Sequence, residues 1–227
     1  MGDIRIWIDS ETVNPALELK KILGESRLED KIIGVEYDSY GLTAKNGKML
    51  DSAFEGFCNL TDASDLVNRL RLVKSEKELV YVRKAAKLAD DALDEAHTLV
   101  KEGCYEGDLL AAMQGAIFRG GVDYPGNEFI IGSGENALLC RYFSGRRKLS
   151  KEDQITLEWA GAYRYYHAAM MRTIPVGRVT DQHQRMFDVC LESMEACQKV
   201  LRPGSAIGGG FDAYASTCDD SGMKDHR

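Results

Sequence analysis

Long apolar runs, a signal-peptide pattern and paired cysteine motifs are all missing from this 227-residue sequence. No stretch approaches the roughly 20 apolar residues that a membrane-spanning helix requires. Residues 1–5 lack the basic flank and apolar segment of a signal peptide. The six cysteines form no C-x-x-C pair, so zinc-like spacing is absent and reduced thiols are favoured. We therefore expect a cytoplasmic protein with no membrane partner.

An excess of positive charge is also missing, because 29 basic residues face 36 acidic ones and the net charge is −7. Such a balance disfavours nucleic acid and anionic membranes as partners. What the sequence does contain is 44% hydrophobic and 29% charged residues, a composition typical of a globular chain that can bury a core.

Hydrophobic periodicity divides the chain into two parts. In the first part, Ile4–Ile8 and Ile32–Glu36 alternate as strands do, and residues 15–24 between them have helical spacing. This strand–helix–strand order predicts a βαβ-type unit, which we interpret as the tail of a larger domain. A joint follows near residues 69–74.

The second part opens with a capping box, Ser75-x-x-Glu78, before a long helix that Gly103 ends. The pattern after it alternates between helices and strands and predicts an α+β fold. The predicted elements are a helix over 108–119, strands over 129–131 and 155–159, a strand closing at 176–177, a helix over 180–201 and a last helical stretch to 222.

The most informative stretch is 124–173, which contains Ser133-Gly134-Glu135-Asn136, Glu158 and Arg172-Thr173. Its spacing resembles the pita-bread superfamily of creatinase, prolidase, aminopeptidase P and methionine aminopeptidase. The resemblance covers roughly residues 30–227. It implies that residues 71–227 are the first half of a pita-bread catalytic domain and residues 1–70 the end of an α/β creatinase-like N-terminal domain. We therefore expect a chain truncated at both ends.

Three positions depart from the peptidase pattern of that superfamily. Arg141 replaces a substrate-binding His, Glu158 replaces the first metal-binding Asp, and Ala169 replaces the second, bridging Asp. Since Ala supplies no oxygen ligand, we expect no metal and no cofactor. The alternative is a degenerate site for two divalent ions, Mn, Co or Zn, formed by Glu158 and residues beyond the chain.

Metal-free members of the superfamily are more similar still. Tyr165-Tyr166-His167-Ala168 resembles a segment of creatinase, and Glu158-x-Ala160-Gly161 with Met170-x-Arg172-Thr173 resembles the ectoine hydrolases. The resemblance implies metal-independent hydrolysis of a C–N bond in a small amide, amidine or peptide-like solute. The alternatives are a metal-dependent Xaa-Pro peptidase and a non-enzymatic relative used for binding or assembly. We also expect a small-molecule or dipeptide substrate, a homodimer in full-length form, and no activity of this chain alone.

Each candidate site residue has two interpretations. Glu158 in its apolar strand is a general base or nucleophile, or else an ion-pair partner of a nearby arginine. His167 is a second catalytic candidate that shuttles a proton or orients Glu158, or a structural hydrogen-bonding residue. Arg141 would anchor a substrate carboxylate, or be a solvated loop charge. Tyr166 and Arg172 are further substrate-binding candidates, although Arg172 can equally tie strand to strand.

Overall fold

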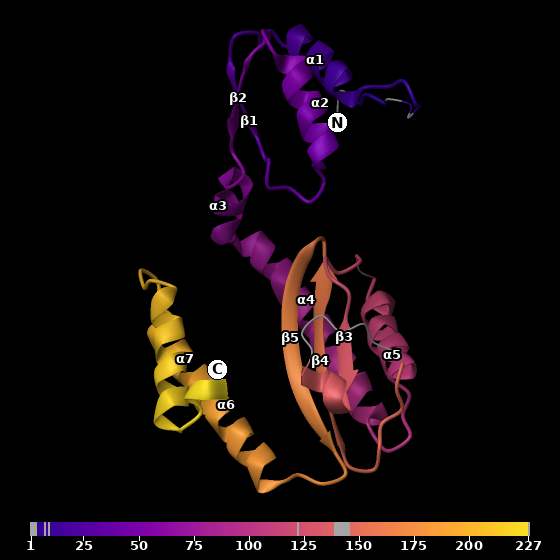
Figure 1. Ribbon diagram of the computed structural model, residues 1–227, viewed down its shortest axis with the longest axis vertical. Coiled ribbons are helices and arrows are strands. Elements are labelled where there is room, and N and C mark those ends of the chain that lie inside the picture. The colour runs from indigo at the N-terminus through magenta and orange to yellow at the C-terminus, as the bar shows by residue number, and fades with distance from the viewer. Residues whose placement is uncertain (1–3, 7, 9, 122, 139–145, 227) are drawn as a thin grey trace. The chain divides into compact units, whose positions relative to one another are not determined.

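The protein is described by a computed structural model that covers residues 4–6, 8, 10–121, 123–138 and 146–226 (Figure 1). The chain separates into two compact units, Met1–Ser75 and Glu76–Arg227. The domain identities that the sequence resemblance assigns to residues 1–70 and 71–227 stay predictions.

The first unit is a small βαβ unit with additional helices. Strands β1 and β2 pair in parallel, and helices α1 and α2 pack on each other around buried Phe54. A parallel pair needs a crossover connection, and α2 supplies it. The element bounds are α1 Pro15–Glu25, β1 Ile32–Val35, α2 Ala44–Phe54, β2 Asn59–Asp62 and α3 Leu66–Leu72.

The partner of β1 differs from the sequence prediction. Described residues 4–6 and 8 form no strand, and Ile4, Ile6 and Ile8 are 74%, 85% and 82% exposed. β1 instead pairs with β2, from Ile32 opposite Asn59 to Val35 opposite Asp62. An alternating pattern becomes a strand only where a partner strand supplies its hydrogen bonds. The βαβ unit is therefore β1–α2–β2, later in the chain than the pattern indicated.

The second unit confirms the predicted α+β order of elements. Its helices and strands match the expected ones, with ends that differ by several residues. The bounds are α4 Glu76–Leu99, α5 Glu106–Arg119, β3 Ile130–Ser133, the 3-10 turn η1 Gly134–Leu138, β4 Asp153–Tyr163, β5 Tyr166–Val176, α6 Asp181–Val200, α7 Gly208–Asp220 and the 3-10 turn η2 Lys224–His226.

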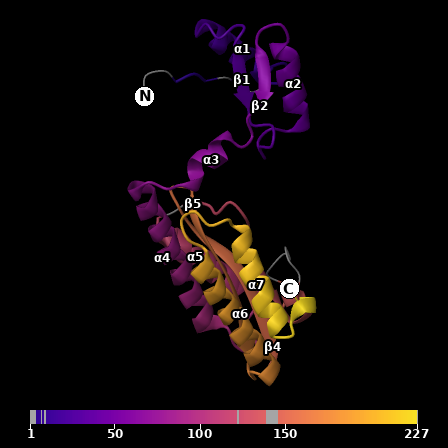
Figure 2. The same cartoon turned by 90° about the vertical axis from the view of Figure 1, so that its left-hand side faces the viewer.

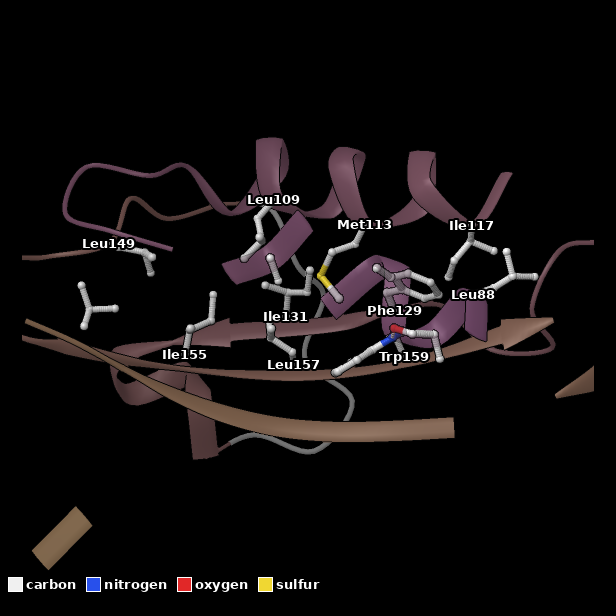
Figure 3. Close-up of a cluster of buried hydrophobic side chains, with 14 residues drawn as sticks. Leu88, Leu109, Met113, Ile117, Phe129, Ile131, Leu149, Ile155, Leu157 and Trp159 are labelled. Carbon is white, nitrogen blue, oxygen red and sulfur yellow. Dashed lines mark hydrogen bonds between the residues drawn. The ribbon is translucent and has the colours of Figure 1, made fainter. Parts of the chain in front are cut away.

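An antiparallel sheet of order β3–β4–β5 forms the centre of this unit. Helices α4 and α5 cover one of its faces (Figures 1 and 2). The side chains between these two layers make the main hydrophobic core, and Figure 3 shows them lying between the helices and the strands. They include Leu88, Leu109, Met113, Ile117, Phe129, Ile131, Ile155, Leu157 and Trp159.

Helix α4 and strand β4 approach each other closely. The helix turns a row of fully buried alanines toward the sheet, namely Ala85, Ala89, Ala92 and Ala96. A β-carbon added at Gly161 would lie 2.0 Å from the carbonyl oxygen of Ala85. The indole N–H of Trp159 donates to the carbonyl oxygen of Ala89 over 2.9 Å. Small residues on both elements therefore set the distance between helix and sheet.

Helices α6 and α7 pack on each other through a few buried residues. Val189, Ser193 and Cys218 are buried there, and the Ser193 hydroxyl lies 3.6 Å from the Cys218 sulfur. Helix α6 begins at a capping box, in which Thr180 and His183 satisfy each other's backbone amides. None of the helices that the structure describes has the length and apolarity needed to cross a membrane.

Candidate active site on the open face of the sheet

The open face of β4 and β5 is the face that α4 and α5 leave uncovered. In an antiparallel pair, directly opposite residues share a face. Glu158 lies opposite Met171, Ala160 opposite Ala169, and Ala162 opposite His167. Leu157 and Trp159, one residue to either side of Glu158, are buried in the helix-covered core. Glu158, His167 and Ala169 therefore all lie on the open face, where each is exposed.

The turn between the two strands decides which β5 residues reach this face. It consists of Arg164 and Tyr165, both with positive φ, 51° and 63°, as in the two-residue turns that suit hairpins. Shifting a strand by one residue moves all of its side chains to the other face of the sheet. The observed turn places Tyr166 opposite Tyr163, on the other face from Glu158.

Tyr166 and Arg172 therefore belong to the other set of β5 residues. The Tyr166 hydroxyl donates to the Glu78 carboxylate of α4 over 2.7 Å, and its ring lies 5.7 Å from that of Tyr81. Arg172 is opposite Leu157, and its guanidinium donates to the carbonyl oxygen of Met171 over 2.8 Å. Neither side chain shares the face of Glu158.

His167 connects the hairpin turn to the preceding loop. Its Nε2 accepts the N–H of Gly126 over 2.9 Å, and its Nδ1 lies 3.0 Å from the carbonyl oxygen of Tyr165. The two contacts together select the neutral tautomer that carries its proton on Nδ1. Four residues of strand, about 13 Å at 3.3 Å per residue, separate its partner Ala162 from Glu158. A direct hydrogen bond between His167 and Glu158 is out of reach.

Residues of η1 also lie on the open face. Gly132 is opposite Thr156, which is two residues from Glu158 along β4 and on the same face. A β-carbon at Gly132 would lie 2.5 Å from the carbonyl oxygen of Asn136, so η1 folds back over the sheet at this point. Arg141, which the sequence analysis proposed for substrate binding, lies outside the described residues. The open face thus brings together Glu158, the threonine pair Thr156–Thr173 and η1.

A buried carboxylate that the sequence did not indicate lies behind η1, on the α5 side of the sheet. Glu106, at the start of α5, is only 1% exposed. Its Oε1 accepts the N–H of Ser133 over 3.0 Å and the Ser133 hydroxyl over 2.6 Å. Its Oε2 accepts the N–H groups of Arg146 and Arg147 over 3.1 and 3.2 Å. The one available signal was a Glu at a helix start, which usually serves the helix terminus alone.

Arg147 extends this network to the first residue of β4. Its guanidinium donates to the Ser133 hydroxyl over 2.7 Å and forms an ion pair with Asp153, whose side chain is 3% exposed. Burial opposes ionisation of Asp153. The hydrogen bonds from the Ser150 N–H, the Arg147 guanidinium and the Gln154 N–H outweigh it, so the pKa of this carboxyl lies below its ordinary value of 3.8.

Asp153→Asn is expected to destabilise the chain by about 1–3 kcal/mol at neutral pH, because the buried carboxylate that accepts from the Arg147 guanidinium and two backbone N–H groups loses its charge. A lowered folded-state pKa stabilises the fold above the ordinary pKa of 3.8, and this contribution is lost as the pH falls through the folded value. Urea unfolding across a pH series should therefore show the gap between variant and wild type closing below 3.8. Exposed Glu152→Gln is the control, and a gap independent of pH would contradict the expectation.

Comparisons with known proteins identify relatives of the chain. The profile of metallopeptidase family M24 matches residues 80–226. The Xaa-Pro aminopeptidase of Escherichia coli is 29% identical over 65% of this chain and 34% of its own length. The ectoine hydrolase of Halomonas elongata is 26% identical over 93% of this chain and 58% of its own. This chain thus spans about a third to three fifths of these two relatives.

Solved structures share the fold. The X-Pro aminopeptidase of Thermotoga maritima superposes with a TM-score of 0.83 at 20% identity, over 96% of this chain and 60% of that one. The prolidase of Pyrococcus furiosus gives a TM-score of 0.79 at 21% identity, over 92% and 60% of the two chains. These matches confirm the expected partial pita-bread fold.

The expectation of no cofactor is contradicted by the match to a family of metallopeptidases. It rested on the replacements at Glu158 and Ala169 and on the resemblance to metal-free members, and these do not define the chemistry of a whole family.

The residues present do not by themselves fit a metal centre. Within the described ranges, no group of three or more His, Cys, Asp or Glu side chains is placed to hold a metal ion. Glu158 is the one carboxylate on the open face of β4 and β5, both of which are fully described. Met171, directly opposite Glu158, and Ala169, two residues along β5 on the same face, have no oxygen in their side chains.

Proposed function

Because the chain belongs to metallopeptidase family M24, we propose that the full-length protein hydrolyses a C–N bond in a small amide, amidine or peptide-like solute. Relatives named Xaa-Pro aminopeptidase, Xaa-Pro dipeptidase and ectoine hydrolase support this class of reaction. All three names describe hydrolases, and the bonds concerned join carbon to nitrogen.

The observation that carries the proposal is the exposed carboxylate of Glu158 on an open sheet face. Its strand neighbours Leu157 and Trp159 are buried, so the packed strand directs the Glu158 side chain toward the open face. As a general base, Glu158 takes a proton from a water molecule whose oxygen bonds to the substrate carbon. The C–N bond then breaks, and the proton passes to the leaving nitrogen. As a nucleophile, Glu158 would instead bond to that carbon itself. The C–N bond would break as the leaving nitrogen takes a proton from water, and the resulting hydroxide would hydrolyse the covalent intermediate and free the carboxylate.

The other candidate residues keep different parts in the proposal. Arg141 would anchor a substrate carboxylate, as the superfamily resemblance implies. His167 would act as a catalytic proton shuttle only after it releases the Gly126 N–H, because its Nε2 accepts a hydrogen bond from that group in the structure. Tyr166 and Arg172 lie on the other face of the sheet from Glu158. They would therefore contact a substrate only at the edge of the sheet.

A second candidate function is that of a metal-dependent Xaa-Pro peptidase. The observation in its favour is the activity named for two relatives, since Xaa-Pro peptidases from Escherichia coli and Pyrococcus horikoshii match at 29% and 26% identity. The ectoine hydrolase match extends over more of this chain. The substrate itself therefore has to separate the two candidates.

We further propose a homodimer in the cytoplasm. The cytoplasm is supported by the described cysteines, residues 58, 104, 190, 197 and 218, which are all free thiols. A reducing compartment keeps such thiols unpaired. The homodimer comes from the superfamily resemblance, and light scattering of the full-length protein would test it.

A substrate panel tests the proposed function. Full-length protein should hydrolyse one class among Xaa-Pro dipeptides, Xaa-Pro tripeptides, ectoine and creatine, each assayed with and without chelator. The 227-residue chain is expected to show no turnover in the same assays, because it spans only part of its relatives. Full-length protein that hydrolyses none of these substrates would refute the proposal.

A further inference from the structure

We propose that Glu106 is a positioning residue that holds η1 in place on the open face beside Glu158. The proposal rests on the proposed function, because η1 matters to catalysis only if that face is the active site. Glu106 itself lies behind the sheet, on the α5 side, and does not touch a substrate there.

The contacts of Glu106 converge on two segments, one directly before η1 and one at Arg146 and Arg147. Oε1 binds Ser133, the residue directly before η1, through both its N–H and its hydroxyl. Oε2 binds the N–H groups of Arg146 and Arg147, where the chain returns to the sheet. A single carboxylate thus satisfies four donors from two points that are thirteen residues or more apart in sequence.

A second link runs through Arg147. Its guanidinium donates to the Ser133 hydroxyl and lies 3.1–3.3 Å from where a β-carbon of Gly134 would be. Gly134 has a φ of +59°, a conformation that glycine adopts at little cost. The backbone therefore turns sharply at Gly134 around the guanidinium, and this turn directs η1 over Gly132 and the open face.

The burial of Glu106 makes these bonds necessary. A carboxylate that is 1% exposed has to be compensated by donors, and the N-terminal turn of α5 adds a favourable dipole. Since each oxygen serves a different segment, removing one oxygen releases either Ser133 or the pair Arg146 and Arg147. That selectivity separates positioning of η1 from support of the core.

Glu106→Gln in full-length protein provides the test, with exposed Asp108→Asn on the same helical turn as control. Gln keeps one oxygen. Whichever way its amide lies, either the donors of Ser133 or the N–H groups of Arg146 and Arg147 face an N–H₂ donor instead of an acceptor. We expect kcat/KM on the best substrate of the panel to fall by roughly 10- to 100-fold, mainly through KM, because Glu158 is untouched. Glu106→Asp, which keeps both oxygens, should recover part of the loss.

Amide hydrogen exchange is the readout that does not depend on activity. Faster exchange at Ser133, Arg146 or Arg147, with β4 amides unchanged, supports the proposal. Unchanged exchange, or equally faster exchange throughout β4, overturns it, as does a loss confined to kcat. If the wild type hydrolyses nothing in the panel, the proposed function fails, and exchange alone then decides the role of Glu106 in the same way.

Discussion

Glu158→Gln is expected to lower kcat of the full-length protein by about 10²–10⁴-fold, the range that a general base contributes. Glutamine has the shape of glutamate but cannot accept a proton at neutral pH. Because Glu158 is exposed, and exposed substitutions usually change stability by less than about 0.5 kcal/mol, the free energy of unfolding should stay nearly constant. Loss of turnover without loss of stability would identify a chemical role.

The matched control is Glu152→Gln, an exposed carboxylate just before the start of β4. Steady-state kinetics and urea unfolding of both variants give the comparison. An active Glu158→Gln enzyme, or an equal loss of turnover in both variants, would remove Glu158 from the mechanism.

Gly161→Ala is expected to have the largest effect on stability, at least about 3 kcal/mol, the upper end of the cost of overpacking a core. The added methyl would lie 2.0 Å from the Ala85 carbonyl oxygen and 2.7 Å from the Ala89 amide nitrogen. Both are backbone atoms of α4, so no side-chain rotation relieves the clash. The helix would have to move away from the sheet, and the packing of the core around Trp159 would loosen.

Gly208→Ala serves as the control, since nothing lies within 4 Å of a β-carbon at that position. Urea unfolding followed by tryptophan fluorescence should show a strong decrease in midpoint for the first variant and little change for the second. A Gly161→Ala protein with wild-type stability would mean that α4 and β4 lie farther apart than described.

The sequence predicted the second unit well because its signals are local. The long apolar period of α4 and the alternation around Glu158 both reflect the order of residues within one element. The first unit was predicted poorly, since β2 has the sequence Asn-Leu-Thr-Asp, with one apolar residue and no visible alternation. Its existence depends on pairing with β1, which no local pattern records.

The candidate site illustrates the same limit at the level of one residue. Glu158 stood out because it interrupts an apolar strand. Whether His167 or Tyr166 joins it depends on the turn, and Arg164 and Tyr165 lack the Asn-Gly signal of a two-residue turn. Asp123 accepts the Tyr165 N–H over 3.3 Å, and His167 contacts the Tyr165 carbonyl. Residues outside the turn therefore support its position, and the position of the turn decides on which face of the sheet each β5 residue lies.

The close contact of α4 with β4 also restricts how this chain can diverge. A larger residue at position 161 meets the backbone of α4, which the alanine row holds against the sheet. Position 161 can therefore vary only together with a shift of the whole helix, which also carries the Trp159 acceptor. Substitutions accepted one at a time would seldom cross that barrier. We expect members of this lineage to keep glycine here even where their catalytic residues have changed.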